Sequence, residues 1–358
     1  MIKNSNSYGL IMAGGIGSRF WPISTPEKPK QFLDVLGLGK SLLQITYERL
    51  ILTIPKENIY ILTNKKYSEI VIDQLPELTK DQILAEPERK NTAPCIAFAS
   101  AKIHAINPNA NLVISPSDHL IINSSKFSTQ LQIAIDESQK DKLVVLGIKP
   151  TRPDTGYGYI EFDNKEGGVA TDVVSVSQFC EKPKLEKAQE FVSKGNFYWN
   201  AGIFVVGTKT ISDLFLKYEI DLYNLFFKNS NEYWAEQEDI FVKKAFSESE
   251  NISFDYAIME KAENTSMVLT DFDWSDLGSW GSIKDHASSD DKKMALINGN
   301  INYFDSENCL LYGQANKTYL IEGLNNHILI DSEDKLLLIP FENEGALKSR
   351  LKTIGEKI

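Results

Sequence analysis

A glycine-rich segment near the N-terminus carries the residues best suited to chemistry. It reads GLIMAGGIGSRFWPISTPEKPKQF over residues 9–32, and its glycines follow directly after an apolar run, at Gly14, Gly15 and Gly17. Glycine lets the backbone approach a ligand closely with its amide groups turned toward it. Three cations follow within twelve residues, at Arg19, Lys28 and Lys30. This combination predicts a loop that binds phosphate groups.

Other uses of such a loop can be compared with its residues. A P-loop closes its glycine run with Gly-Lys-Ser/Thr, whereas this one has Gly17-Ser18-Arg19. A dinucleotide fingerprint needs a third glycine, and Phe20 stands at that position. A nicotinamide-dependent dehydrogenase is therefore disfavoured. From these residues alone, the loop could also be a tight strand–helix turn with a solvated basic tail that binds no ligand.

Polar residues elsewhere in the chain could complete such a site. Asp118 follows the apolar run at residues 111–115, at the edge of an expected sheet where open α/β folds bind their ligands. Asp276 lies in WSDLGSW. Each aspartate taken alone is more typical of a cap or turn residue than of a metal ligand. Asn91 and Thr92 precede an alanine-rich stretch and can cap a helix there.

The first half of the chain alternates short apolar runs with amphipathic stretches. Strands are predicted at residues 8–12, 58–63, 83–85, 111–115 and 143–147, and helices at 41–54, 67–75, 92–106 and 127–138. This alternation predicts an α/β fold, with a Rossmann-like, mostly parallel sheet flanked by helices.

The second half has a different texture. Strands are predicted at residues 157–162, 173–179 and 202–206, with helices at 185–193 and 255–262, as additions to the same sheet. A polar run at 284–293 predicts a linker, and β-rich segments follow at 300–304, 309–312, 318–322, 327–331 and 335–339, closed by a helix at 344–351. We therefore expect a catalytic domain at 1–285 and a small β-rich, short-solenoid-like C-terminal domain at 292–358.

The composition narrows the class of protein. The 358 residues are 42% hydrophobic and 24% charged, as in a globular protein, and the net charge of -11 disfavours nucleic-acid and membrane partners. The three cysteines are far apart and lack metal-ligand spacing, which indicates reduced thiols in the cytoplasm. Neither a secretory signal nor an apolar stretch of about 20 residues is present. The composition does not decide whether the protein forms a homodimer.

Several motifs in the sequence carry a family resemblance. The order Gly-Gly-x-Gly-x-Arg-aromatic-Trp-Pro, followed by Pro-Lys-Gln-Phe, resembles the signature of the sugar-nucleotide pyrophosphorylases, most of all their mannose-1-phosphate guanylyltransferase branch. Further matches follow in register: EPERKNTAP, SPSDH, TGYGYIE, FCEKP, WNAGIF, SFDYAIMEKA and WSDLGSW. The resemblance covers about residues 8–340. It implies the nucleotide-diphospho-sugar transferase type of fold.

The resemblance also implies a reaction and a set of site residues. The substrates would be GTP and mannose 1-phosphate, the products GDP-mannose and pyrophosphate, with Arg19 and Lys30 as catalytic cations. Asp118 and Asp276 would hold Mg²⁺ or another divalent cation. Nucleotide-binding positions would be Ala13, Gly14, Gly15, Gly17, Ser18, Arg19, Glu86, Asn91 and Thr92. Sugar-phosphate positions would be Gly158, Glu181, Lys182 and Asn200.

Two departures from the family pattern affect the choice of base and the grip on phosphate. Lys90 and Thr25 stand where the family usually has arginine. Another nucleotide and sugar, such as dTTP with glucose 1-phosphate, therefore remain an alternative. A non-catalytic, sugar-nucleotide-binding regulatory subunit is a second alternative. Loss of Arg19, Lys30 or either metal-site aspartate would favour it, and all four are present.

Overall fold

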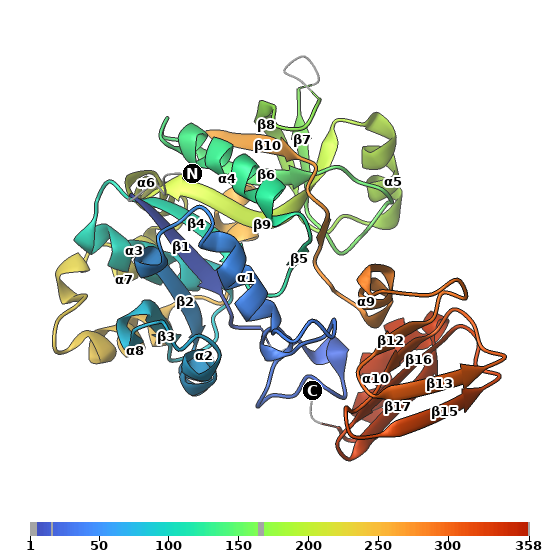
Figure 1. Cartoon of the computed structure of the whole chain (residues 1–358). Helices are drawn as coiled ribbons and strands as arrows, with labels where there is room; N and C mark the ends of the chain where they lie inside the picture. The colour runs from blue at the N-terminus through green and yellow to red at the C-terminus, as the bar shows by residue number, and fades with distance from the viewer. Residues whose placement is uncertain (1–5, 16, 164–167, 357–358) are drawn as a thin grey trace. The chain divides into compact units, whose positions relative to one another are not determined.

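The protein, seen here in a computed structural model, divides into two compact units (Figure 1). Residues 6–15, 17–163 and 168–356 are described. The first unit is Met1–Gly14, Tyr47–Pro116 and Ile121–Trp274, and the second is Gly15–Thr46, Ser117–Leu120 and Ser275–Ile358. Both units thus join segments that are far apart in the sequence. The separation into domains at 1–285 and 292–358 stays a prediction.

A large mixed sheet forms the centre of the first unit. Its strands are β1 (Ser7–Met12), β2 (Ile59–Asn64), β3 (Ile83–Glu86), β4 (Asn111–Pro116), β6 (Leu143–Ile148), β7 (Tyr159–Phe162), β8 (Val173–Cys180), β9 (Phe197–Gly207) and β10 (Thr265–Thr270). They lie in the order β3-β2-β1-β4-β9-β6-β10-β8-β7. The short elements α1 (Leu42–Leu50), β5 (Leu120–Ile121) and β11 (Trp274–Ser275) include residues of both units.

The pairing of these strands explains where ligand-binding residues can gather. β1 pairs in parallel with β2 and β4, and β2 with β3, so the carboxyl ends of these strands meet at one edge. β9 runs antiparallel between β4 and β6, and β10 is parallel to β6. The predicted Rossmann-like α/β fold is confirmed, with antiparallel strands added in its second half.

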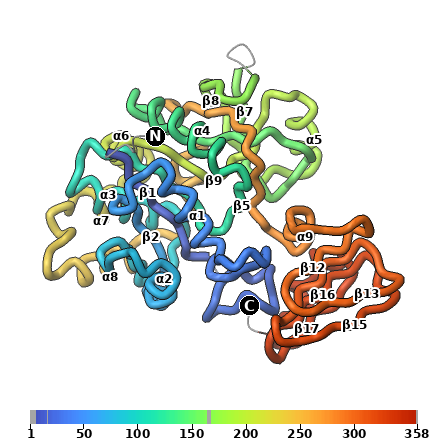
Figure 2. Tube along the Cα trace, viewed as in Figure 1, coloured from blue at the N-terminus to red at the C-terminus, as the bar shows by residue number. Residues whose placement is uncertain are grey.

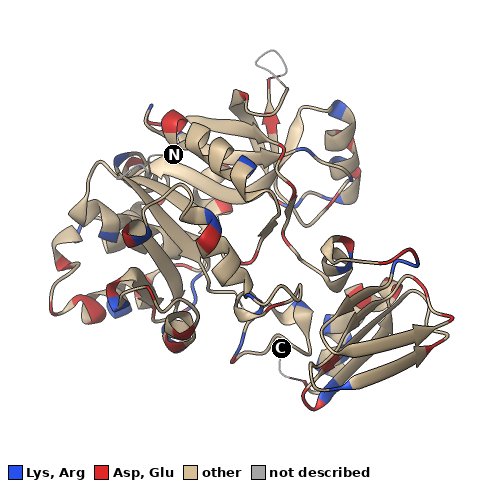
Figure 3. Cartoon of the chain, viewed as in Figure 1, with Lys and Arg blue, Asp and Glu red and all other residues tan. Residues whose placement is uncertain are grey.

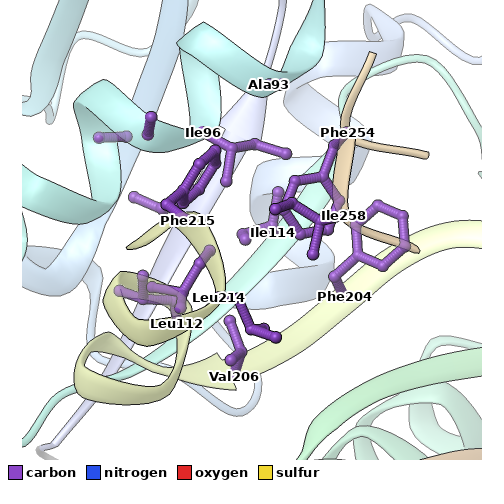
Figure 4. Close-up of a cluster of buried hydrophobic side chains, with 14 of the residues drawn as sticks. Ala93, Ile96, Leu112, Ile114, Phe204, Val206, Leu214, Phe215, Phe254 and Ile258 are labelled. Carbon is purple, nitrogen blue, oxygen red and sulfur yellow. The ribbon is translucent and has the colours of Figure 1, made fainter. Parts of the chain in front are cut away.

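Helices cover both faces of this sheet. They are α2 (Ser68–Gln74), α3 (Thr92–Ile106), α4 (Ser124–Ser138), α5 (Leu185–Lys194), α6 (Thr208–Tyr218), α7 (Ile220–Phe226), α8 (Glu238–Glu248) and a π-helix at Asp255–Met259. Single 3-10 turns lie at Lys56–Asn58, Lys65–Tyr67, Lys80–Gln82 and Ser230–Glu232. α4 packs over β6, β9 and β10. Figure 4 shows the core, where α3 and α6 meet β4 and β9.

The second unit is built around stacked strands. They are β12 (Ala295–Ile297), β13 (Asn300–Phe304), β14 (Leu310–Tyr312), β15 (Thr318–Glu322), β16 (His327–Ser332) and β17 (Lys335–Pro340). β12, β14 and β16 pair in parallel, as do β13 and β15, which is the stacking of a short solenoid (Figure 2). β17 closes the stack antiparallel to β16.

Short helices complete the second unit. They are the 3-10 turns Ser18–Phe20 and Lys30–Phe32, α9 (Trp280–His286), the 3-10 helix Phe341–Ala346 and α10 (Leu347–Thr353). One apolar cluster joins Phe20 and Trp21 of the glycine-rich segment to Trp280 of α9 and to the solenoid strands. The C-terminal strands and the phosphate-loop candidate therefore share one core.

Some predicted boundaries are wrong. The linker expected at 284–293 begins inside α9, because Trp280 and Ile283 are buried on one face of that helix. The helix expected at 344–351 is split between a 3-10 helix and α10. The helix expected at 255–262 is a π-helix that ends at Met259.

The exterior matches an ordinary globular protein. Acidic and basic residues both occur along helices such as α5 and α8 (Figure 3). All three cysteines are free thiols, with Cys95 and Cys309 buried. Within the described part of the chain, no helix is both long and apolar enough to span a bilayer.

Candidate active site

The glycine-rich segment folds back so that Gly15 and Gly17 lie against Lys30 and Gln31. Gly17 has φ 67°, a left-handed conformation that favours glycine. A side chain there would overlap the Lys30 Cβ and come within 3.0 Å of the Lys30 amide nitrogen. The side-chain NH₂ of Gln31 donates to the Gly15 carbonyl at 3.0 Å. Glycine at position 17 is thus what lets Lys30 approach the turn.

Lys30 is the centre of the resulting cluster. It is 3% exposed, and its ammonium group donates to Asp118 Oδ2 at 3.2 Å and to the main-chain oxygen of Asp276 at 2.8 Å. The same nitrogen lies 5.0 Å from the centre of the Phe20 ring. The structure therefore brings both metal-site candidates, Asp118 and Asp276, to the buried ammonium group of Lys30, which is itself a catalytic candidate.

Asp276 and Arg19 meet at the next turn of the chain. Asp276 Oδ1 accepts from the Gly278 amide at 3.1 Å, and Arg19 donates to the Gly278 carbonyl at 3.3 Å. A side chain on Gly278 would lie 2.6 Å from Asp276 Oδ2 and 3.2 Å from the Arg19 guanidinium. The exposed Arg19 side chain is thus held beside the Asp276 carboxylate.

Opposing effects act on the Asp118 carboxyl. Burial raises its pKa, but Lys30, His119 and hydrogen bonds lower it further, so its pKa lies below the ordinary value. His119 Nε2 is 4.0 Å from Asp118 Oδ1. Asp118 is therefore ionised at neutral pH and available as an oxygen ligand.

The donors at this site suit a divalent cation that arrives with phosphates. Across the described residues, no group of three or more His, Cys, Asp or Glu side chains is arranged to hold a metal by itself. Mg²⁺ commonly uses only one or two protein carboxylates, with phosphates and waters as its other ligands. Asp118 and Asp276 supply two, and the Lys30 ammonium bonds to the Asp118 carboxylate and to the Asp276 main-chain oxygen. This donor set fits the expected ion.

The base-binding candidates lie in the first unit. Ala13 is anchored to β2, since its amide donates to Leu62 at 2.7 Å and its carbonyl accepts from Thr63 at 2.8 Å. A side chain on Gly14 would be 3.8 Å from Glu86 Oε1. Gly14 and Glu86 therefore meet at the carboxyl edge of β1 and β3.

Glu86 is an unusual carboxylate. It is 5% exposed, and burial raises its pKa to about 7, against the smaller lowering effects of a Cys95 hydrogen bond and of Arg89. Arg89 itself donates to the Tyr67 hydroxyl at 2.7 Å. Glu86 can thus gain or lose a proton near neutral pH.

Asn91 and Thr92 serve as caps in the structure. The Asn91 side chain accepts from the Thr92 amide at 2.9 Å, with Asn91 at φ 69°. The Thr92 hydroxyl accepts from the Phe254 amide at 2.8 Å. The capping role that their sequence position allows is present, whereas their contact with a nucleotide stays a prediction.

The sugar-side candidates form a second cluster in the first unit. A side chain on the buried Gly158 would lie 2.6 Å from Glu181 Oε2 and 3.4 Å from the Asn200 Cβ. Asn200 donates through its main-chain amide to the Gly158 carbonyl at 2.8 Å. Lys182 pairs with Glu181 at 2.6 Å. All four predicted residues are therefore brought together, with Gly158 between the polar side chains.

Asp255 also belongs to this cluster. It lies in the π-helix and accepts from the Asn200 side chain at 3.0 Å. Burial and the neighbouring Glu181 raise its pKa to about 6. Two nearby aromatic residues pack against each other, with the ring centres of Tyr157 and Trp199 5.0 Å apart.

One contact beside the cluster of Arg19, Lys30, Asp118 and Asp276, called here the phosphate-side cluster, could not be predicted from the sequence. Glu344, from the C-terminal 3-10 helix, accepts from the amides of Trp280 and Gly281. These amides begin α9, directly after the Asp276 turn. No spacing rule links a glutamate to a motif more than 60 residues earlier.

The chain is similar to known proteins over most of its length. A model of the family described as "Nucleotidyl transferase" matches residues 8–293. Alginate biosynthesis protein AlgA of Pseudomonas putida is 30% identical over 351 residues, covering 97% of this chain and 71% of that protein. Mannose-1-phosphate guanylyltransferase of Salmonella montevideo is 34% identical over 356 residues, covering 98% and 73%.

A solved structure is also similar over nearly its whole length. It is described as mannose-1-phosphate geranyltransferase from Thermus thermophilus and superposes with a TM-score of 0.86 at 27% identity. The match covers 98% of this chain and 99% of that one. It extends through the solenoid strands as well as the large sheet.

Proposed function

Because the chain belongs to the nucleotidyl transferase family, we propose that it joins GTP to mannose 1-phosphate, giving GDP-mannose and pyrophosphate. The choice of substrates follows from the relatives that carry this activity in their names and from the motifs shared with that branch. The observation that carries the proposal is the Lys30 ammonium, held between the Asp118 carboxylate and the Asp276 carbonyl.

The reaction needs positioning and charge neutralisation more than a strong base. A phosphate oxygen of the sugar phosphate attacks the α-phosphorus in line, the bond to the β-phosphate oxygen breaks, and pyrophosphate leaves. The attacking group is already an anion, so the protein must bring two polyanions together and stabilise the charge that develops between them. Buried cations and backbone amides are the groups suited to that work.

Each group on the phosphate side has a role that its chemistry supports. Lys30 presents a compact charge to the α-phosphate and the sugar phosphate, since its position is fixed by two hydrogen bonds. Arg19 offers a planar fork that can hold two oxygens of the β- and γ-phosphates. Asp118 and Asp276 would hold Mg²⁺, which neutralises phosphate charge when bound. The backbone amides of Gly15, Gly17 and Ser18 would donate hydrogen bonds to the triphosphate.

Groups in the first unit suit the base and the sugar. An ionised Glu86 accepts from the two adjacent N–H groups on the pairing edge of guanine, next to the Gly14 backbone. Glu181 and Asn200 accept from or donate to the hydroxyls of a hexose, and Lys182 binds its phosphate. Asn200 is oriented for this by Asp255.

A product analysis tests the proposal directly. Incubation with GTP, mannose 1-phosphate and Mg²⁺ should give GDP-mannose and pyrophosphate in equal amounts, identified by mass spectrometry. Release of inorganic phosphate instead of pyrophosphate would contradict transfer at the α-phosphorus. Tight binding of GDP-mannose with no turnover would favour the regulatory subunit. A cytoplasmic location and a homodimer stay predictions.

A further inference from the structure

Glu344 reaches the phosphate-side cluster from the C-terminal end of the chain. Its Oε1 accepts from the Trp280 amide and its Oε2 accepts from the Gly281 amide at 3.2 Å. These amides belong to the first turn of α9, whose N–H groups have no partner inside the helix. Both oxygens of one carboxylate are thus committed to two neighbouring backbone donors.

The next two backbone amides of α9 have hydrogen-bond acceptors within the helix's own first turn. Ser279 accepts from the Ser282 amide at 3.1 Å in a capping box, and the Ile283 amide donates to the Ser279 carbonyl at 3.2 Å. A local cap therefore already holds the third and fourth amides. Glu344 holds the first two, which are the ones that adjoin the Asp276 turn.

The segment between Asp276 and Trp280 is consequently fixed at three points. Lys30 binds the Asp276 carbonyl at 2.8 Å, Arg19 binds the Gly278 carbonyl at 3.3 Å, and Glu344 binds the Trp280 amide. The turn between these points is constrained, since Leu277 has φ 45°, an uncommon value for a non-glycine residue. Of the three holding side chains, only Glu344 comes from the C-terminal part of the chain.

A pocket of about 430 Å³ opens beside this segment. Arg19, Ser279, Glu344 and Lys348 are among the residues that line it. The two cations and the Ser279 hydroxyl make the pocket suitable for a compact anion, and the Glu344 carboxylate is already hydrogen-bonded to backbone amides. Arg19 also acts on Glu344, since burial raises the pKa of Glu344 and Arg19 partly offsets that rise. Arg19 and Glu344 are therefore electrostatically coupled across the pocket.

We propose that Glu344 is a positioning residue for the pyrophosphate end of the reaction. It fixes the Asp276–Trp280 segment and Arg19, so that the pocket lined by Arg19 and Lys348 receives the two phosphates that leave as pyrophosphate. This inference rests on the proposed function. It gives the C-terminal part of the chain a direct role in the phosphate site, beyond completing the apolar core around Trp280.

Direct binding of pyrophosphate tests the inference without relying on turnover. The Glu344→Gln variant keeps the side-chain size but places an NH₂ group against a backbone N–H donor. We expect its Kd for pyrophosphate with Mg²⁺, measured by calorimetry, to rise about tenfold, the loss expected for one misplaced charged hydrogen bond. Glu342→Gln is the matched control, because Glu342 lies in the same 3-10 helix and is exposed.

A second variant and a comparison of two KM values distinguish a positioning role of Glu344 from a role in protein stability alone. Lys348 lies on the exposed face of α10, and Lys348→Met should weaken pyrophosphate binding without lowering the Tm. In Glu344→Gln the KM for GTP should rise, while the KM for mannose 1-phosphate should change less than about twofold.

The possible outcomes are distinct. A lower Tm in Glu344→Gln with pyrophosphate binding equal to that of Glu342→Gln would overturn the inference alone. The same holds if the Kd of Lys348→Met equals that of the wild type. If the wild-type protein fails to bind pyrophosphate with Mg²⁺, both this inference and the proposed function are wrong.

Discussion

The ammonium group of Lys30 lies 3.2 Å from Asp118 Oδ2, although 88 residues separate them in the sequence. The same nitrogen reaches the Asp276 main chain, at a sequence separation of 246. One buried cation therefore bonds to the Asp118 carboxylate and to the main chain of Asp276, the two residues proposed to bind the metal. Its position depends on Gly17, where a side chain would overlap that of Lys30.

Removal of the Lys30 charge should stop catalysis. In Lys30→Met we expect kcat to fall roughly 100-fold to 1000-fold, because a fixed cation at the reacting phosphates is lost. Asp118 would also lose its ion-pair partner, so the Tm should fall by several degrees. Lys28→Met is the control, since Lys28 is exposed in the same loop and should keep kcat within about threefold. Equal activity of the two variants would exclude Lys30 from the chemistry.

Chelation should abolish turnover reversibly. EDTA should remove activity and Mg²⁺ should restore it, and Asp276→Asn should raise the Mg²⁺ concentration for half-maximal rate about tenfold or more. The Tm should stay nearly unchanged, because the Lys30 ammonium donates to the Asp276 main-chain oxygen, which the substitution keeps. Asp273→Asn, at an exposed position three residues earlier, provides the control. A normal Mg²⁺ dependence in Asp276→Asn would remove that carboxylate from the metal site.

Gly158→Ala should impair the sugar side selectively. A methyl group there would lie 2.6 Å from Glu181 Oε2 and 2.9 Å from the Phe179 ring, so Glu181 must move. We expect the KM for mannose 1-phosphate to rise about tenfold with the KM for GTP little changed. Gly207→Ala is the matched control on β9, because its nearest contact would be an ordinary 3.6 Å. An equal rise in both KM values would indicate a general distortion instead.

The buried Glu86 should make stability depend on pH. Its pKa is raised from 4.5 to about 7 in the folded protein, so the folded state holds this proton more tightly than the unfolded state. The resulting stabilisation is complete below about pH 4.5 and is lost as the pH rises through 7, which amounts to roughly 3 kcal/mol in the free energy of unfolding.

Denaturant titrations from pH 5 to pH 8 can measure this effect. The wild type should lose more stability over that range than Glu86→Gln, whose amide does not titrate. Glu88→Gln should behave as the wild type, since Glu88 is half-exposed beside Lys90. Parallel pH curves for the wild type and Glu86→Gln would show that Glu86 titrates normally.

The sequence predicted much of this site because its motifs occupy strand ends. Gly14 follows a predicted strand and Asp118 was expected at the sheet edge, whereas the roles of Ala13 and Glu86 were expected only from the family resemblance. Parallel pairing of β1, β2 and β3 brings Ala13, Gly14 and Glu86 to one edge. The cluster of Gly158, Glu181 and Asn200 was expected only from the family resemblance. Their contact depends on β7, β8 and β9 pairing antiparallel, which local patterns do not specify.

Other features depend on contacts that no local pattern encodes. Residues 208–248 form three helices whose apolar faces pack on α3 and one another, and β10 is a strand because β6 and β8 pair with it on both sides. Glu344 could not be expected at α9, since that contact requires the solenoid to bring residue 344 back to residue 280.

Substrate preference tests the central claim most directly. Initial rates of pyrophosphate release should be measured with Mg²⁺ for GTP plus mannose 1-phosphate and for dTTP plus glucose 1-phosphate, each at the same concentrations. We expect the first pair to be faster by at least about tenfold, because Glu86 would accept from both N–H donors of guanine and thymine offers only one. Equal or faster turnover of dTTP with glucose 1-phosphate would contradict it.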